Sequence, residues 1–132
     1  MSSTRISPEI REFVTRFLPS VEHLETFMLL RRNTTRSWSA PEIAVELRIP
    51  ESRAADVLEQ LASANFLAVK ISNEILYRFN PASEALETLS ARCANLWVRE
   101  RIAMINLVTA ATLSPIHDFA EAFRLKKDKS RG

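Results

Sequence analysis

Four residues carry side chains that could take part in acid–base or nucleophilic chemistry: His23, the adjacent pair His117 and Asp118, and Cys93, which is the only cysteine. Neighbouring positions of a helix do not face each other, so His117 and Asp118 lack the geometry of a catalytic pair. His23 has no nucleophile or metal ligand to work with, which predicts a solvated histidine on a helix face. Cys93 falls on an apolar helical stripe, which predicts a buried and unreactive thiol.

The sequence lacks the motifs of the common nucleotide-dependent enzymes. Its single glycine is Gly132, so there is no glycine-rich loop to cradle a phosphate and no dinucleotide-binding fingerprint. One cysteine allows neither a disulfide framework nor a cysteine cluster for zinc. A paired-carboxylate or nucleophile constellation is also missing. We therefore expect a protein that is not an enzyme and that uses no cofactor and no metal.

Length and composition indicate one globular domain over residues 1–132. The hydrophobic fraction of 46% with 26% charged residues is that of a chain with a buried core. A chain so poor in glycine and in β-branched runs should be mainly helical. Residues 1–5 have no apolar core behind them, and the longest uncharged run, 102–116, is too short to cross a bilayer. We expect a soluble, cytoplasmic protein.

The middle of the chain contains the clearest local signals. Ser39 and Glu42 have the spacing of a capping box, so a helix should begin at Ala40. Pro50 lies where the first residue of a second helix tolerates proline, and apolar residues follow at helical spacing. Asn65 stands where a helix usually ends in a left-handed residue. These signals predict two short helices joined by a tight turn.

Two β-branched and aromatic segments, 66–71 and 75–79, follow the second helix and flank the short turn 72–74. This pattern predicts an antiparallel hairpin. Residues 38–79 are therefore expected to form one unit of helix, turn, helix and hairpin.

Helices are also predicted on the N-terminal side of this unit, over residues 8–33. A Ser-Pro start and an apolar stripe predict a helix from Pro8 to about Leu18. Ser20 caps a second helix that should end near Arg32.

On the C-terminal side, Asn80 and Pro81 form another cap-and-proline start, and no proline follows before Pro115. A continuous helix from Pro81 to Leu113 would be about 50 Å long at 1.5 Å per residue. A compact monomer of this size should be only about 36 Å across. The helix would overhang its own domain and expose its most apolar half, so we expect a homodimer.

Residues 80–125, including a last helix opened by Ser114 and Pro115, would then form the dimerisation helices, and 126–132 a basic tail. The candidate dimer-interface residues are apolar side chains of the flanking helices: Phe13, Phe17, Trp97, Met104, Leu107, Val108, Phe119 and Phe123.

The capping box at Ser39, the stop at Asn65 and the hairpin together resemble the winged helix-turn-helix of bacterial transcriptional regulators. The layout is most similar to the multiple-antibiotic-resistance type, in which flanking helices build a dimer. The resemblance covers residues 20–80 well and the remainder by general layout. It implies a mainly α fold with a two-stranded wing, in which Trp38 takes the place of the family's short first strand. It also implies a homodimeric regulator that binds a pseudo-palindromic site on double-stranded DNA.

In such regulators the exposed first turns of the second helix enter the major groove, while basic wing residues meet phosphates. The matching positions here are Ser52, Arg53, Ala55 and Asp56, with Glu59 or Gln60 one turn further on. Arg53 suits guanine, and Ser52 suits a phosphate or a base edge. The candidates for phosphate contact are Lys70, Arg78, Arg31, Arg32 and Arg36. Arg31 and Arg32 also have the placement that a helix dipole favours at a C-terminus.

The charge pattern keeps a second interpretation open. Residues 40–64 hold five acids and two bases, a balance of −3, and residues 124–132 hold five bases and one acid, a balance of +4. DNA affinity comes largely from neutralised phosphates, so a negatively charged groove-reading helix gains little from this source. The alternative is a winged-helix module that binds a protein partner or serves as a dimerising adaptor, with little or no DNA binding.

Overall fold

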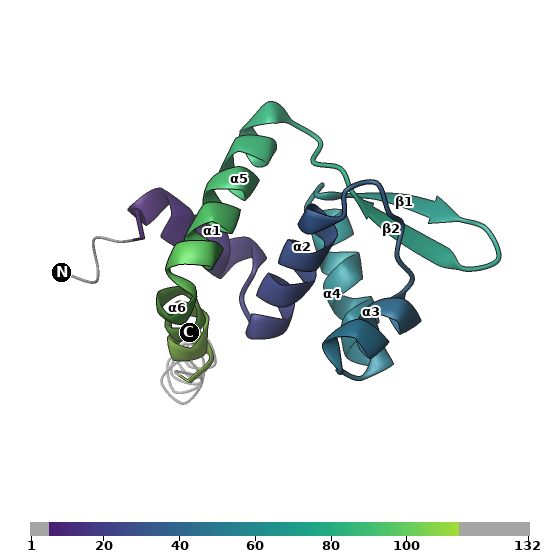
Figure 1. The fold of residues 1–132 in the computed structure, drawn as a ribbon, viewed down its shortest axis with the longest axis horizontal. Helices are drawn as coiled ribbons and strands as arrows, with labels where there is room; N and C mark the ends of the chain where they lie inside the picture. Colours follow the sequence, from purple (N-terminus) through teal and green to yellow (C-terminus); the bar gives the residue numbers. More distant parts are fainter. Residues whose placement is uncertain (1–5, 114–132) are drawn as a thin grey trace, which may run out of the picture.

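The computed structural model describes residues 6–113, which form six helices and a two-stranded antiparallel sheet (Figure 1). In chain order the elements are α1 (Pro8–Phe17), α2 (Val21–Arg32), α3 (Ala40–Leu47), α4 (Glu51–Ser63), β1 (Leu67–Ile71), β2 (Ile75–Phe79), α5 (Glu84–Arg99) and α6 (Arg101–Leu113). The mainly helical fold with one hairpin confirms the predicted class. Within the described residues, no helix has the length and apolar character that a membrane span requires. The predicted last helix and the basic tail lie outside the described residues.

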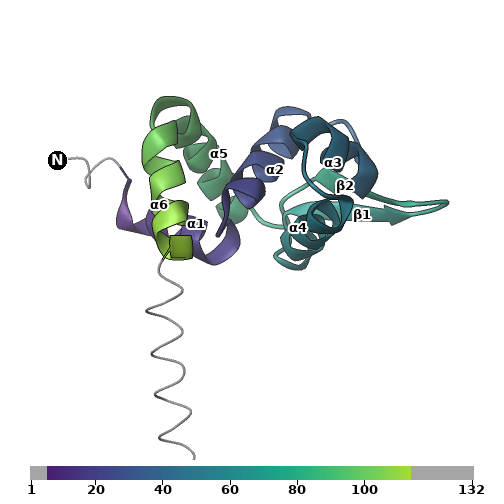
Figure 2. The same cartoon turned by 90° about the horizontal axis from the view of Figure 1, so that it is seen from below.

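Helix α2 stands between two groups of elements (Figures 1 and 2). At one end α1, α5 and α6 pack against one another, and at the other end α3 and α4 pack beside the hairpin. The hairpin projects from the body as a wing (Figure 1). The predicted winged helix-turn-helix is therefore present, with helices flanking it on both sides.

Side-chain caps fix the starts of the first two helices. Ser7 Oγ accepts a hydrogen bond from the Ile10 N–H at 3.2 Å, and Pro8 is the first helical residue. Ser20 Oγ accepts one from the His23 N–H at 3.1 Å. Each cap satisfies a backbone donor that has no partner within its own helix. Both predicted helix starts are confirmed.

The predicted capping box at the start of α3 is present. Ser39 Oγ accepts from the Glu42 N–H at 3.3 Å, while the Ser39 N–H donates to Glu42 Oε1 at 2.9 Å. The turn to α4 passes through Arg48, whose φ of 58° is left-handed although the residue is not glycine. Pro50 is the N-cap of α4, and Glu51 is its first residue, one position later than predicted.

Asn65 follows α4 with a φ of 73°, which confirms the predicted left-handed stop. The hairpin then pairs in a register that runs from Leu67 opposite Phe79 to Ile71 opposite Ile75.

Trp38 pairs with β2 on the opposite edge from β1. Its N–H donates to the Tyr77 carbonyl oxygen and its carbonyl oxygen accepts from the Tyr77 N–H, both at 2.7 Å. This bridge ties the segment before α3 to the wing, so Trp38 does take the place of a short first strand, as predicted.

Phe66 lies at the centre of the hydrophobic core and is fully buried. Its ring meets those of Phe13, Phe17 and Phe27 edge to face, with centroids 5.4 to 5.6 Å apart. Such pairs are each worth about 0.5–1.5 kcal/mol beyond the area they bury. Because Phe66 comes directly after Asn65, the left-handed stop of α4 places this ring between α1 and α2.

The predicted continuous helix from Pro81 to Leu113 is wrong at two points. The helix begins only at Glu84, where Ser83 Oγ accepts from the Leu86 N–H. It then leaves helical geometry at Glu100, with φ −129° and ψ 44°, before α6 begins.

The break at Glu100 lets α6 pack back against α1 and α2. Met104 and Val108 thereby become buried, with exposed fractions of 0% and 1%. Burying one such side chain is worth about 1.5–3 kcal/mol, which offsets the local loss of helix. No proline or glycine, the usual sequence signals of a kink, stands at this point. Since the protomer itself covers these residues, a helix that overhangs its domain is no longer an argument for a dimer.

The position of Phe66 leads to a stability prediction. Phe66→Ala should lower the free energy of unfolding by about 3–5 kcal/mol, because it leaves a cavity among three aromatic rings. Chemical denaturation followed by circular dichroism measures this loss. Val45→Ala, at a site that is 80% exposed, serves as the control and should change stability by less than about 0.5 kcal/mol. Equal effects of the two substitutions would contradict the central place of Phe66.

Candidate nucleic-acid interface

Helix α4 buries one face and turns the opposite face to solvent. Its buried residues are Ala54, Val57, Leu58 and Leu61. Its exposed residues include Glu51, Ser52, Arg53, Asp56, Glu59 and Gln60, while Ala55 is half-buried. The outer face of the first turns therefore carries Ser52, Arg53 and Asp56, as predicted.

Arg53 is engaged in an ion pair with α2. Its Nε lies 2.8 Å and its NH2 nitrogen 2.6 Å from the same carboxylate oxygen, Glu22 Oε1. Both side chains are partly exposed, at 44% and 31%. The guanidinium predicted to read guanine is thus held at the side of α4 by a residue of another helix. Nothing in the sequence spacing, 31 positions apart, indicated this partner.

Gln60 also faces α2, where it contacts a buried histidine. His23 Nε2 lies 2.5 Å from Gln60 Oε1, and His23 Nδ1 lies 2.7 Å from Ser20 Oγ. Because Gln60 Oε1 can only accept, Nε2 is the protonated nitrogen and Nδ1 accepts from the hydroxyl. His23 is only 6% exposed, so the predicted solvated histidine is wrong: the ring joins the cap of α2 to α4. The Gln60 side-chain oxygen is therefore engaged in the contact between α2 and α4.

The wing presents Lys70 and Arg78 on one face. In the hairpin register Lys70 stands opposite Leu76 and Arg78 opposite Ala68, so these four side chains share a face. The other face carries the buried residue Tyr77. The two predicted phosphate-contacting residues of the wing therefore lie together.

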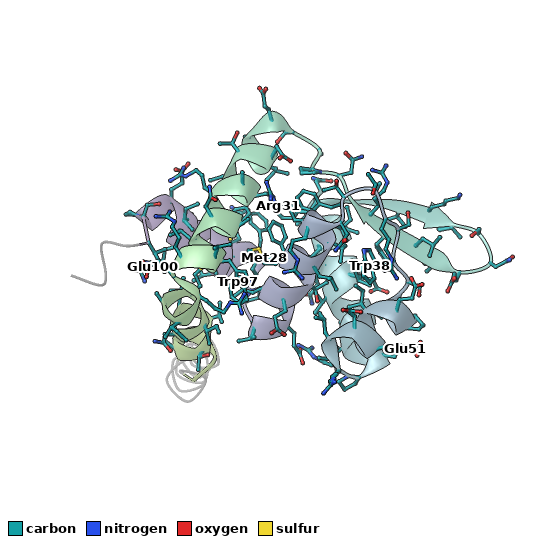
Figure 3. All side chains as sticks on the ribbon, viewed as in Figure 1. Met28, Arg31, Trp38, Glu51, Trp97 and Glu100 are labelled. Carbon is teal, nitrogen blue, oxygen red and sulfur yellow. The ribbon has the colours of Figure 1, made fainter. Side chains whose placement is uncertain are left out.

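The three other candidate arginines do not join one surface. Arg36 lies over the Trp38 ring, 3.6 Å from its centroid, and its NH2 nitrogen is 3.7 Å from Glu42 Oε2. The Arg31 side chain is turned toward α5, with NH2 3.9 Å from Glu87 Oε2 (Figure 3). Arg32 is exposed on α2. Arg31 therefore lies away from the α4 and wing surface, contrary to the gathering of cations that phosphate binding would favour.

Charge on the winged-helix unit is close to balanced and slightly negative. Residues 33–80 contain six acids and five bases, a balance of −1. Burial raises the pKa of the Tyr77 hydroxyl on the wing, and the carboxylate of Glu59 on α4 raises it further. Of the five bases, Arg36 and Arg53 are engaged with carboxylates, while Arg48 is exposed on the turn before α4 and Lys70 and Arg78 lie on the wing.

A cleft of about 290 Å³ lies between α2 and the α5–α6 corner. Its lining combines apolar side chains with guanidinium groups: Met28, Ala91, Ala94, Trp97, Val98, Asn95, Arg31, Arg32 and Arg101. Arg101 stacks on the Trp97 ring at 4.7 Å from its centroid. Met28, Arg31 and Trp97 are seen together between α2 and α5 in Figure 3. The sequence did not predict this cleft, because the break at Glu100 that places Arg101 there has no local signal.

Cys93 is fully buried on α5, as predicted. Burial raises the pKa of its thiol to about 12, although the nearby Arg31 guanidinium acts in the opposite direction. The thiol is therefore protonated over the physiological range. Among the described residues, no group of three or more His, Cys, Asp or Glu side chains is placed to hold a metal ion.

Four of the predicted dimer-interface residues belong to the protomer's own core. Phe13, Trp97, Met104 and Val108 are each 5% exposed or less. The folding back of α6 covers them, so they offer no free surface to a second copy. Phe17 and Leu107 are half-buried, and Phe119 and Phe123 lie outside the described residues.

Comparison with known proteins reveals similarity of fold. No family model matches the sequence, and no curated protein matches it. The heme sensor protein PefR from Streptococcus agalactiae, solved in complex with heme, is 12% identical and superposes with a TM-score of 0.52 over 86% of this chain and 83% of its own.

Two further proteins align less closely. The adhesin competence repressor AdcR from Streptococcus pyogenes gives a TM-score of 0.49 at 13% identity, covering 80% of this chain and 79% of its own. The transcriptional regulator Tm0710 from Thermotoga maritima gives 0.46 at 12% identity, covering 92% and 85%. The fold of residues 6–113 is a winged helix-turn-helix.

The state of Cys93 leads to a prediction about reactivity. The native protein at pH 8 should not react with a disulfide reagent such as dithionitrobenzoate, because only the thiolate is nucleophilic and the buried thiol stays protonated. The guanidinium-unfolded protein should react completely, since burial no longer raises the pKa. Release of thionitrobenzoate, with Cys93→Ala as a blank, measures both. Rapid reaction of the native protein would show that α5 opens easily.

Proposed function

We propose that this protein is a DNA-binding transcriptional regulator that acts as a homodimer. The observation that carries the proposal is the exposed outer face of the first turns of α4, next to a wing on which Lys70 and Arg78 share one face. In winged helix-turn-helix complexes the helix reads base edges and the wing contacts the backbone. The likeness to PefR supports the winged helix-turn-helix fold on which this proposal rests.

The ion pair between Arg53 and Glu22 has to open for base contact. A partly exposed ion pair contributes only about 0–1 kcal/mol, because water solvates both groups well. A bidentate arginine–guanine contact contributes about 1–3 kcal/mol of discrimination. Arg53 can therefore exchange Glu22 for a guanine, and Glu22 holds its side chain in an ordered position until DNA arrives.

The homodimer is supported by apolar residues left in water at the α5–α6 corner. Val98 is 79% exposed and Ile102 is 69% exposed, on consecutive helices. Half-buried Leu107 on α6 and Phe17 on α1 add to the apolar surface of the same end of the molecule. A second copy that covers these side chains would remove them from water and space two α4 helices for two half-sites.

A second function is favoured by the charge of the same surface. Residues 33–80 carry a net charge of −1, and residues 40–64, which contain α3 and α4, carry a net charge of −3. A surface of this sign suits a protein partner better than a polyanion. In this case the chain would be a winged-helix interaction or adaptor module with little or no DNA binding.

The DNA-binding proposal predicts the behaviour of two matched variants. Lys70→Ala should weaken binding to a mixed pool of duplex DNA and reduce the slope of log K against log salt by about one per bound protomer. Glu22→Gln should strengthen binding, because it releases Arg53 and removes a competing carboxylate. Fluorescence anisotropy at two salt concentrations measures both effects.

Glu25→Gln, on the same helix, is the control for Glu22→Gln, because it removes an equal charge without touching Arg53. The gain from Glu22→Gln should exceed that of Glu25→Gln and should vanish in the Arg53→Ala background. Absence of DNA binding at low salt would refute the regulator and leave the interaction module.

The homodimer leads to a separate prediction. Ile102→Glu should shift the protein toward monomer, because a carboxylate at the centre of an apolar contact would be buried without a partner. Sedimentation velocity measures the change in mass, and Val45→Glu, at an 80% exposed valine of α3, is the control. A monomeric wild-type protein would contradict the proposed dimer.

A further inference from the structure

The outer edge of β1 carries backbone groups that the hairpin itself does not use. Trp38 and Tyr77 exchange both of their backbone hydrogen bonds, so Tyr77 directs its N–H and C=O away from β1. Backbone groups of successive strand residues point to opposite sides, so the neighbours of Tyr77 in β2 direct theirs toward β1. The residues opposite those neighbours, Ala68 and Lys70, complete the ladder on the β1 side.

It follows that Leu67, Val69 and Ile71 direct their N–H and C=O groups outward, away from β2. Over residues 6–113, no backbone hydrogen bond from outside the hairpin reaches these groups. Figure 1 shows the hairpin projecting from the body with β1 along its outer border. The edge is therefore open to solvent over Val69–Ile71, whereas Leu67, at the start of the strand, is buried where β1 meets α4.

Two side chains in the outer part of the same strand, Val69 and Ile71, are apolar and exposed. Val69 is 47% and Ile71 77% exposed, and Ile75, opposite Ile71 on β2, is 45% exposed. All three share the face whose inner part, Tyr77 and Phe79, is buried in the body. An exposed strand with open backbone groups and apolar side chains is a template for pairing with another strand.

We propose that β1 pairs antiparallel with β1 of a second copy of this chain, in a register centred on Val69. In this register Val69 stands opposite itself, and Leu67 of each copy stands opposite Ile71 of the other. Every outward N–H and C=O of both strands then has a partner, as in bonded pairs of an ordinary antiparallel sheet. The two hairpins become one four-stranded sheet.

The sequence of β1 selects this register over its neighbours. Lys70 stands opposite Ala68 of the second copy, so no like charges meet directly. A shift by two residues in one direction would set Lys70 against Lys70, which is destabilising across a strand pair. A shift by two residues in the other direction would leave the outward backbone N–H and C=O groups of Ile71 without partners in both copies. Self-complementarity of this kind points to a second copy of the chain as the occupant.

The combined sheet would have two different faces. A two-fold axis through Val69, perpendicular to the sheet, keeps equivalent side chains on the same side. Leu67, Val69 and Ile71 of both copies would form one apolar face, while Lys70 and Arg78 of both copies would gather on the other. The few exposed side chains involved are far fewer than the ~20–30 residues a side of a standard interface, so the contact should be weak and depend on concentration.

Hydrogen exchange on the full chain over a dilution series tests the register directly. The amides of Val69 and Ile71 should become protected as concentration rises, because they acquire acceptors in the second copy. The amide of Lys70 should be protected at every concentration, since it already belongs to the β1–β2 ladder. A general apolar association would not produce this alternation. Unchanged exchange at Val69 and Ile71 at the highest concentration would overturn the proposal.

Variants give an independent readout by sedimentation. Val69→Pro removes an outward N–H but no ladder bond, and proline is tolerated where an edge N–H faces solvent. In the Ile102→Glu background, where the α5–α6 contact no longer contributes, Val69→Pro should weaken association about tenfold while circular dichroism and thermal unfolding remain those of the Ile102→Glu protein. Lys70→Pro removes a hydrogen bond of the β1–β2 ladder. It serves as the reference for how damage to the hairpin changes circular dichroism and thermal unfolding.

Ile71→Lys places a charge in the pairing face and should weaken association as much as Val69→Pro. Val45→Lys, with the same charge at an equally exposed valine, should not. Ile102→Glu, which addresses the α5–α6 surface, should leave the protection of the Val69 amide in place. With the α5–α6 surface blocked by Ile102→Glu, association that survives both Val69→Pro and Ile71→Lys would refute pairing through β1 without touching the proposed regulator.

Discussion

The packing of Phe66 between α1 and α2 holds the two ends of this protein together. The ring comes from the segment that joins α4 to the wing, yet its aromatic partners come from α1 and α2. It can take this place only because Asn65 adopts a left-handed conformation that ends α4 and reverses the chain. A second tie, the Trp38–Tyr77 bridge, fixes the wing against the start of α3. The orientation of α4 relative to the wing, on which any groove-reading function depends, follows from these two contacts.

The surface that results is poorer in available cations than the sequence indicated. Five arginines and a lysine are candidates for contacts with DNA, but tertiary contacts engage three of the arginines: Arg53 with Glu22, Arg36 with Trp38 and Glu42, and Arg31 with Glu87. Glu22 and Glu87 lie on other helices, whereas Trp38 and Glu42 follow Arg36 closely in the chain, and all these contacts compete with phosphate and base contacts. Because exposed ion pairs contribute little free energy, they order the side chains without making them unavailable. DNA binding at this surface would therefore require phosphates to displace the carboxylates that now contact the arginines. The dependence of DNA affinity on salt concentration measures this exchange.

The flanking helices show how one local break changes the assembly of the whole molecule. With a straight helix through Glu100, the most apolar segment would have required a second copy to cover it. With the break, α6 buries Met104 and Val108 within the protomer and leaves Val98 and Ile102 at the corner in water. The same break brings Arg101 beside Trp97 and forms the cleft between α2 and α5. Apart from Val45 on α3, the exposed large apolar side chains of residues 6–110 lie at this corner and on the wing.

Local signals in the sequence determined the beginnings and ends of most elements. The capping box at Ser39, the stop at Asn65 and the alternating hairpin residues each act through neighbours within a few positions, so their geometry could be predicted without knowledge of the rest of the fold. The class of fold followed from their order, and the outer face of α4 followed from helical periodicity. Only the tertiary structure decided that His23 is buried, that Arg53 meets Glu22, and that the C-terminal helix breaks at Glu100. Each of these depends on contacts between residues far apart in the chain, whose energies outweigh local preference and leave no trace in local spacing.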